Sequence, residues 1–279
     1  GRRHPAYAHP AAADADRDDT IKNIRTQTQT KRPRRLARHL RHPPLRGDAR
    51  QAESKHGFGQ AAVHRPEHRG GVHFGEIIVF YLDSQFFMTL TAEEYFQRGL
   101  EKAQQGLFEE AIAYWTKAIA LDPNDVVTYY NRGNAKSDLG DKRGAILDYD
   151  KALKLNPNFA LLYAGRGNAK SDLGDKRGAI LDYNKAIECN PNDVLSFYNR
   201  GVTKSELGDK RGAILDYNKA IKRNPKYAMA YMNRGNDKSD LGDKRGAILD
   251  YDKAIKLNPK NAMAHNNRGF TKSALGDKR

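Results

Sequence analysis

A period of 34 residues constrains what this chain can fold into more than any other feature of its sequence. Prolines recur at that interval, at Pro123, Pro157, Pro191, Pro225 and Pro259. Aromatic residues recur at the same interval, at Trp115, Tyr149, Tyr183, Tyr217 and Tyr251. Self-similarity at one fixed spacing of this length is typical of proteins built from stacked copies of a small supersecondary unit.

The spacing of apolar residues within each period predicts helices. In the second period, Ala145, Tyr149 and Ala152 fall at i, i+4 and i+7, on one face of a helix. Asp141 precedes this segment, where a carboxylate can cap free backbone amides. The proline of the period ends the helix, because it lacks the N–H that continues the hydrogen-bond ladder.

An earlier helix is predicted over residues 126–139 of the same period. Gly133 lies within it, and so small a residue lets two helix backbones approach closely. Two antiparallel helices cannot bury their apolar faces alone, so we expect successive periods to stack on one another.

The order of small, aromatic and proline positions in this period resembles the tetratricopeptide (TPR) repeat. The resemblance implies an all-α fold, a right-handed α-α superhelix, in a solenoid domain over residues 88–279. Its concave groove would be formed by the first helix of each unit. The expected units, numbered 1 to 6 from here on, are residues 92–125, 126–159, 160–193, 194–227, 228–261 and the half unit 262–279.

Residues 1–87 lack the period and form a separate segment. They hold eight of the nine histidines, six of the eleven prolines and +7 of the net charge of +15. We expect this basic segment to be disordered, outside the functional fold and not necessarily translated natively, because Met88 stands directly ahead of unit 1. Its densest cluster, residues 31–35, has no interleaved aromatic residue, so nucleic acid is not the expected partner.

No set of residues predicts catalysis, a metal site or a cofactor. The paired histidines, His39 with His42 and His64 with His68, have no converging carboxylate or cysteine. A serine recurs once per unit, which is typical of a solenoid surface and not of one active site; these residues are Ser137, Ser171, Ser205, Ser239 and Ser273. We therefore expect a protein that is not an enzyme.

Cys189 is the one cysteine, so no disulfide framework exists and a reducing, cytoplasmic location is expected. Leucine holds the same place in other units, which predicts an inert core thiol. No apolar run is long enough to cross a membrane.

Each unit departs from the family pattern by carrying an arginine before its glycine and a lysine four residues later, as in Arg132 and Lys136. We interpret these as ion pairs with an aspartate of the second helix, here Asp148. The alternative is a basic stripe for an anionic partner. Tyr114 replaces the aspartate in unit 1, where the pairing is expected to fail.

The resemblance implies a protein-interaction scaffold that binds a partner protein or an extended peptide in its groove. Asparagines recur at the sixth and ninth positions of the units, on one helix face, and resemble the asparagine ladder that lines some TPR superhelices. Gly165 interrupts the series at the sixth position of unit 3. The predicted groove residues are Tyr130, Asn131, Asn134, Asn168, Tyr198, Asn199, Met232, Asn233, Asn236 and Asn267. Lysines of the carboxylate-clamp type are missing at the corresponding places, which argues against that ligand.

The alternative function is a docking or regulatory array of a larger enzyme or sensor truncated at Arg279, because the chain stops within the turn of unit 6. An uncapped end is also expected there. It would leave Met263 and Leu275 exposed and could permit self-association.

Overall fold

The computed structural model describes residues 90–276, and the expectations for residues 1–87 lie outside this part of the chain. The described residues form α-helices joined by short turns, without a strand. The eleven helices of this part are α3 (Ala92–Gln104), α4 (Phe108–Leu121), α5 (Val126–Asp138), α6 (Lys142–Leu155), α7 (Ala160–Asp172), α8 (Lys176–Cys189), α9 (Val194–Glu206), α10 (Lys210–Arg223), α11 (Ala228–Asp240), α12 (Lys244–Leu257) and α13 (Ala262–Ala274).

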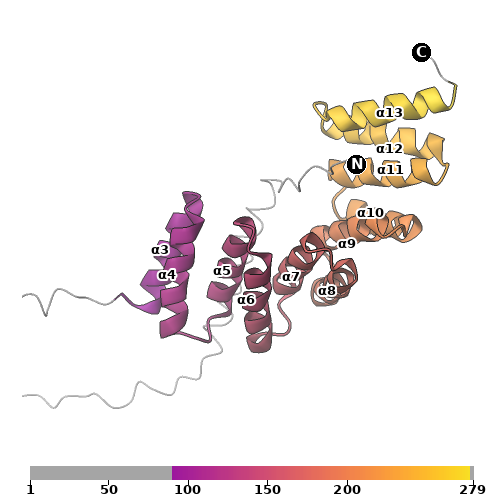
Figure 1. Cartoon of the computed structure of the whole chain (residues 1–279). Helices are drawn as coiled ribbons and strands as arrows, with labels where there is room; N and C mark the ends of the chain where they lie inside the picture. The colour runs from indigo at the N-terminus through magenta and orange to yellow at the C-terminus, as the bar shows by residue number, and fades with distance from the viewer. Residues whose placement is uncertain (1–89, 277–279) are drawn as a thin grey trace, which may run out of the picture. The chain divides into compact units, whose positions relative to one another are not determined.

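Helices follow one another in pairs, and each pair packs against the next along the chain (Figure 1). The helix bounds coincide with the 34-residue period, so each full unit contributes one pair. Within unit 2 the turn between the helices contains Gly140, whose φ of +89° lies in the left-handed region that favours glycine. The predicted all-α solenoid of the TPR type is confirmed.

Side-chain caps begin the second helices as the sequence predicted. Asp141 accepts a hydrogen bond from the backbone N–H of Gly144 at 2.8 Å. Asp175, Asp209 and Asp243 make the same contact in units 3 to 5, at 2.9 Å. Each carboxylate satisfies an amide that would otherwise lack a partner in the first turn, next to the positive end of the helix dipole.

The core lies between the helices, where small residues face large aromatic ones. Tyr149 is 1% exposed and Ala152 is fully buried. A Cβ at Gly133 would lie 2.8 Å from Cε1 of Tyr149, so only glycine lets the ring sit against α5. This contact confirms the predicted close approach of the two helices.

Three positions depart from the sequence-based expectations. Cys189 is exposed and is not a core thiol, because it is the last residue of α8 and lies beyond the buried stripe. Ser171 is buried, and Ser205 is half-buried and donates to Asp237 in unit 5 at 2.6 Å. The prediction that the recurring serines lie on the surface is therefore wrong at these places, because unit stacking covers them.

The residues expected to be left open at the end of the array are exposed to about the same extent as their counterparts in unit 5, where Met229 is 36% and Leu241 is 47% exposed. Met263 and Leu275 are 47% and 46% exposed, and Phe270 is 77% exposed.

Candidate functional site

The recurring arginines form a network that ties each unit to the one before it. In units 2 to 5, Nε and Nη2 donate to both oxygens of an aspartate on the second helix of the same unit, at 2.5 to 3.0 Å. The pairs are Arg132–Asp148, Arg166–Asp182, Arg200–Asp216 and Arg234–Asp250. The lysine one turn later also reaches the aspartate, as Lys136 reaches Asp148 at 2.9 Å.

The third arm of each guanidinium contacts the preceding unit. Its Nη1 donates to one residue of the second helix there, at 2.5 to 3.1 Å. The acceptors for Arg132, Arg166, Arg200 and Arg234 are Thr116, Asp150, Asn184 and Asn218. Burial alone would lower the pKa of Arg166, but its hydrogen bonds to Asp182 and Asp150 outweigh burial and raise that pKa.

These contacts decide between the two interpretations of the basic positions. The predicted ion pairs are confirmed: in units 2 to 5 the arginine and the lysine both engage the aspartate of the second helix, two cations to one carboxylate. Unit 1, with Tyr114 at the aspartate position, differs as expected, because Lys102 pairs with Glu110 at 2.7 Å instead.

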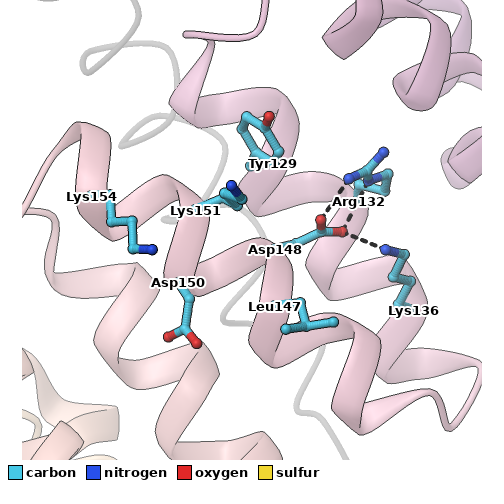
Figure 2. Close-up of a pocket in the computed structure, with 8 residues that line it drawn as sticks. All are labelled: Tyr129, Arg132, Lys136, Leu147, Asp148, Asp150, Lys151 and Lys154. Atoms are coloured by element: carbon cyan, nitrogen blue, oxygen red, sulfur yellow. Dashed lines mark hydrogen bonds and ion pairs between the residues drawn. The ribbon is translucent and has the colours of Figure 1, made fainter.

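A shallow hollow of about 450 Å³ opens beside this network in unit 2. Figure 2 shows Arg132 and Lys136 reaching Asp148 on one side of it, with Lys151 and Lys154 across from them. Arg132, Lys136 and Asp148 are already paired with one another, so these three side chains offer little for a ligand to bind. Its lining residues are Tyr129, Arg132, Lys136, Leu147, Asp148, Asp150, Lys151 and Lys154.

A second hollow of about 510 Å³ includes Cys189 and Tyr163. Partial burial, together with the neighbouring Glu188, raises the pKa of the Cys189 thiol. The thiol therefore stays protonated near neutral pH and is not an activated nucleophile. Within residues 90–276 no cluster of three His, Cys, Asp or Glu side chains could hold a metal ion.

The predicted asparagine series is present, and its amides are linked across units. Asn199 Nδ2 donates to Asn168 Oδ1 at 3.0 Å, and Asn267 Nδ2 donates to Asn236 Oδ1 at 2.8 Å. Asn233 Nδ2 donates to the Tyr198 hydroxyl at 2.9 Å. In each case the sixth residue of one unit reaches back to the unit before it.

Each ninth-position amide accepts a hydrogen bond from inside its own unit. Tyr149, Tyr183 and Tyr251 donate their hydroxyls to the Oδ1 atoms of Asn134, Asn168 and Asn236, at 2.8 to 2.9 Å. These asparagines are half-buried, and their Nδ2 groups donate to no acceptor within the described residues. The ninth positions therefore present free amide donors in units 2, 3 and 5, with Val202 interrupting the series in unit 4.

Some predicted groove residues are not available as a contact surface. Tyr130 is 1% exposed, Met232 is 4% exposed, and Asn131 and Tyr198 are each 8% exposed. The Tyr130 ring packs against Tyr149, with centroids 6.4 Å apart. The prediction that these side chains line an open groove needs correction, because the stacked units cover them.

Sequence reasoning missed the links between units. The sixth position of one unit and the ninth of the previous one are 31 residues apart, and that spacing pairs asparagines twice, at residues 168 and 199 and at residues 236 and 267. A search for polar pairs at this offset would have found both contacts.

No helix in the described part of the chain is long and apolar enough to cross a membrane.

Comparison with known proteins agrees with this architecture. Tetratricopeptide repeat profiles match residues 126–159, 160–193 and 182–214, and a TPR repeat profile matches residues 99–140 and 239–276. Together these matches cover more than half of the chain. No curated protein matches the chain significantly in sequence.

Solved structures share the fold. The crystal structure of MamA is 29% identical, with a TM-score of 0.55, over 59% of this chain and 96% of that one. MamA from Desulfovibrio magneticus RS-1 is 22% identical, with a TM-score of 0.57, over 61% and 97%. YrrB, described as "a TPR protein with an unusual peptide-binding site", is 22% identical, with a TM-score of 0.54, over 70% and 96%. Repeat period, paired helices and matching profiles agree: the chain belongs to the tetratricopeptide repeat family.

Proposed function

We propose that this chain is a non-enzymatic protein-interaction scaffold that holds an extended peptide along the first helices of its units. The free amide donors at the ninth positions of units 2, 3 and 5 carry the proposal. The side-chain oxygen of each of these asparagines already accepts a hydrogen bond from a tyrosine, so the amide is oriented before a ligand binds. The three residues are Asn134, Asn168 and Asn236. Preset donors cost less conformational entropy on binding than free side chains do.

The chemistry of such a row suits the backbone of an extended segment. Each Nδ2 can donate to a peptide carbonyl oxygen, and every residue of a peptide supplies one. Apolar side chains near the row can add specificity, since Leu161 and Leu195 are half-buried and Met229 is 36% exposed. YrrB, which shares the fold, is described as having a peptide-binding site, and this supports the same class of ligand here. A cytoplasmic location stays a prediction from the single cysteine.

The test replaces donors without changing shape. Asn168→Asp combined with Asn236→Asp keeps the oxygen that accepts from tyrosine but removes the N–H groups. Two lost bonds of about 0.5–1.5 kcal/mol each predict roughly tenfold weaker binding. Peptides selected from a displayed random library on the unaltered protein serve as ligands, and affinity is measured by calorimetry.

Asn184→Asp combined with Asn218→Asp is the matched control. It adds the same charge within the arginine network, at the position where unit 2 already has Asp150. We expect it to change affinity less than twofold. Equal effects of the two double variants, or no effect of the first, would show that the asparagine row does not hold the peptide.

A further inference from the structure

A pair of lysines at the hollow of unit 2 has no partner in the described part of the fold. Lys151 and Lys154 line this hollow, across from Arg132 and Lys136 (Figure 2). Both lysines are exposed, and neither side chain makes a hydrogen bond, an ion pair or a ring contact with another described residue. Unlike the cations of the arginine network, these two are therefore available to a ligand.

An exposed leucine adds an apolar element to the same hollow. Leu147 also lines it and is 66% exposed. Lys151 follows this leucine by four residues and Lys154 by seven. Residues at i, i+4 and i+7 share one face of a helix, so α6 presents the leucine and the two lysines in one stripe.

The carboxylates that line the hollow are compensated within the fold. Asp148 belongs to the arginine network of unit 2. Asp150 accepts a hydrogen bond from Arg166 Nη1 of unit 3 at 2.6 Å. The two lysines therefore leave an excess of positive charge at the hollow, which favours an anionic partner.

The same set of residues recurs in unit 5. All eight residues that line the hollow of unit 2 have an identical counterpart three periods later. Lys253 and Lys256 are exposed and have no side-chain partner among residues 90–276, and Leu249 is 71% exposed. Asp252, the counterpart of the carboxylate that pairs with the following unit, is bound by Arg268 at 2.7 Å.

The two units between them lack a free pair of lysines at these positions. In unit 3, Glu188 stands where unit 2 has Lys154, and it pairs with Lys185 at 2.7 Å. In unit 4, Lys219 lies over the Phe197 ring, 5.5 Å from its centroid. The free lysine pairs of units 2 and 5 are therefore separate sites and not parts of one continuous basic band.

We propose that units 2 and 5 each bind an acidic segment of a partner protein, one in which carboxylate side chains lie next to an apolar side chain. The carboxylates match the two ammonium groups, and the apolar side chain covers the exposed leucine. The two lysine–leucine sites consist of Leu147, Lys151 and Lys154 and of Leu249, Lys253 and Lys256.

Other anions fit these sites less well. Inorganic phosphate has no apolar part to cover the leucine. An anionic lipid surface favours a continuous basic face, which Glu188, with its side chain 61% exposed, interrupts in unit 3. No asparagine of the candidate groove lines the hollow of unit 2, so this inference does not rest on the proposed function.

The direct test is an NMR titration of the isotopically labelled full chain with an acidic peptide. The probe consists of three copies of Asp-Leu-Glu-Glu with blocked ends, and its neutral counterpart consists of three copies of Asn-Leu-Gln-Gln. We expect saturable shifts of the backbone signals of residues 147–154 and 249–256, and none of residues 181–188. The neutral peptide is expected to bind about fivefold more weakly, since single exposed ion pairs contribute little.

Lys151→Gln combined with Lys154→Gln removes the site of unit 2 alone. We expect this variant to lose the shifts of residues 147–154 and to keep those of residues 249–256. Lys226→Gln combined with Lys260→Gln is the matched control, because these lysines are also exposed and have no side-chain partner in the described part of the chain. The control removes the same charge from a strongly basic chain and is expected to keep both sets of shifts.

Glu188→Lys tests the same reasoning by a gain of binding. It supplies the second lysine in unit 3 and releases Lys185 from its present partner. Because Leu181 is 65% exposed there, we expect a third site with shifts of residues 181–188.

Several outcomes would overturn the proposal. They are equal binding of the acidic and neutral peptides, shifts of residues 147–154 that persist without the two lysines of unit 2, equal losses in the control, and no new shifts in Glu188→Lys. If the acidic peptide does not bind, but phosphatidylglycerol vesicles bind the unaltered chain and not the variant without these lysines, the sites recognise a lipid surface and not a protein segment.

Discussion

Replacing Asp216 with asparagine tests whether the arginine network stabilises the fold. Asp216 is 2% exposed and accepts from Arg200 Nε at 2.9 Å, from Arg200 Nη2 at 2.5 Å and from Lys204 Nζ at 2.8 Å. The asparagine side chain would keep the shape of the carboxylate but leave two cations against a neutral amide. Removing one partner of a buried ion pair typically costs about 3–5 kcal/mol.

The expected loss for Asp216→Asn lies at the lower end of that range. The side chains of Arg200 and Lys204 are 12% and 24% exposed, so both can recover some hydration. We expect the free energy of unfolding to fall by about 3 kcal/mol. With a urea dependence of about 2–3 kcal/mol per molar, the midpoint falls by about 1 M.

The assay is urea unfolding followed by circular dichroism, analysed with a nearest-neighbour description because stacked repeats need not unfold in one step. Arg268→Ala is the matched control. Within the described residues Arg268 contacts only Asp252 in this network, and their side chains are 31% and 48% exposed, so its removal is expected to cost about 0–1 kcal/mol. A loss for Asp216→Asn no larger than that of the control would refute a stabilising role for the buried pairs.

Three further predictions concern single positions. Gly133→Ala is expected to lower the free energy of unfolding by about 1–3 kcal/mol, because the new Cβ would press on the Tyr149 ring. A Cβ at Gly269 would have no atom within 4 Å, so Gly269→Ala is expected to raise the free energy of unfolding by about 0.5–1 kcal/mol. Urea unfolding measures both, and changes of the same sign would contradict the packing argument. Asp141→Ala removes a cap and is expected to cost about 1 kcal/mol, against no measurable change for Asp138→Ala at the exposed end of α5. Burial raises the pKa of Asp237 above its ordinary value of 3.8, so the group's contribution to stability is present below that value and lost as pH rises through the folded pKa. Asp237→Ala is therefore expected to raise the thermal midpoint more at about pH 7 than at about pH 4, and a pH-independent difference would show that ionisation of Asp237 does not matter.

The elements that repeat within one unit could be predicted from the sequence. Helix bounds, the Asp141 cap and the Arg132–Asp148 pair depend on contacts within 34 residues, and each recurs often enough to stand out. The close approach at Gly133 followed from the size of one residue opposite one ring.

Contacts between units could not be predicted in the same way. Burial of Tyr130 and the link from Asn199 to Asn168 depend on how far each unit rotates on the one before, which no single period encodes. The exposure of Cys189 depends on where α8 ends relative to its neighbours. For the candidate groove, the sequence could not show which side chains of the first helices stay accessible.

The arginine network also bears on how a chain of this kind changes length. Each unit from 2 to 6 carries an arginine that contacts the unit before it, and each of units 1 to 5 carries an acceptor for the arginine of the unit after it. Inserting or deleting a whole unit therefore leaves every guanidinium with an acceptor. Units 2, 3 and 5 share the segment that spans the turn and the start of the second helix without a change, so recombination between them is possible at the level of sequence. Gain or loss of whole units by recombination would then change the length of the solenoid without leaving a buried arginine unpaired.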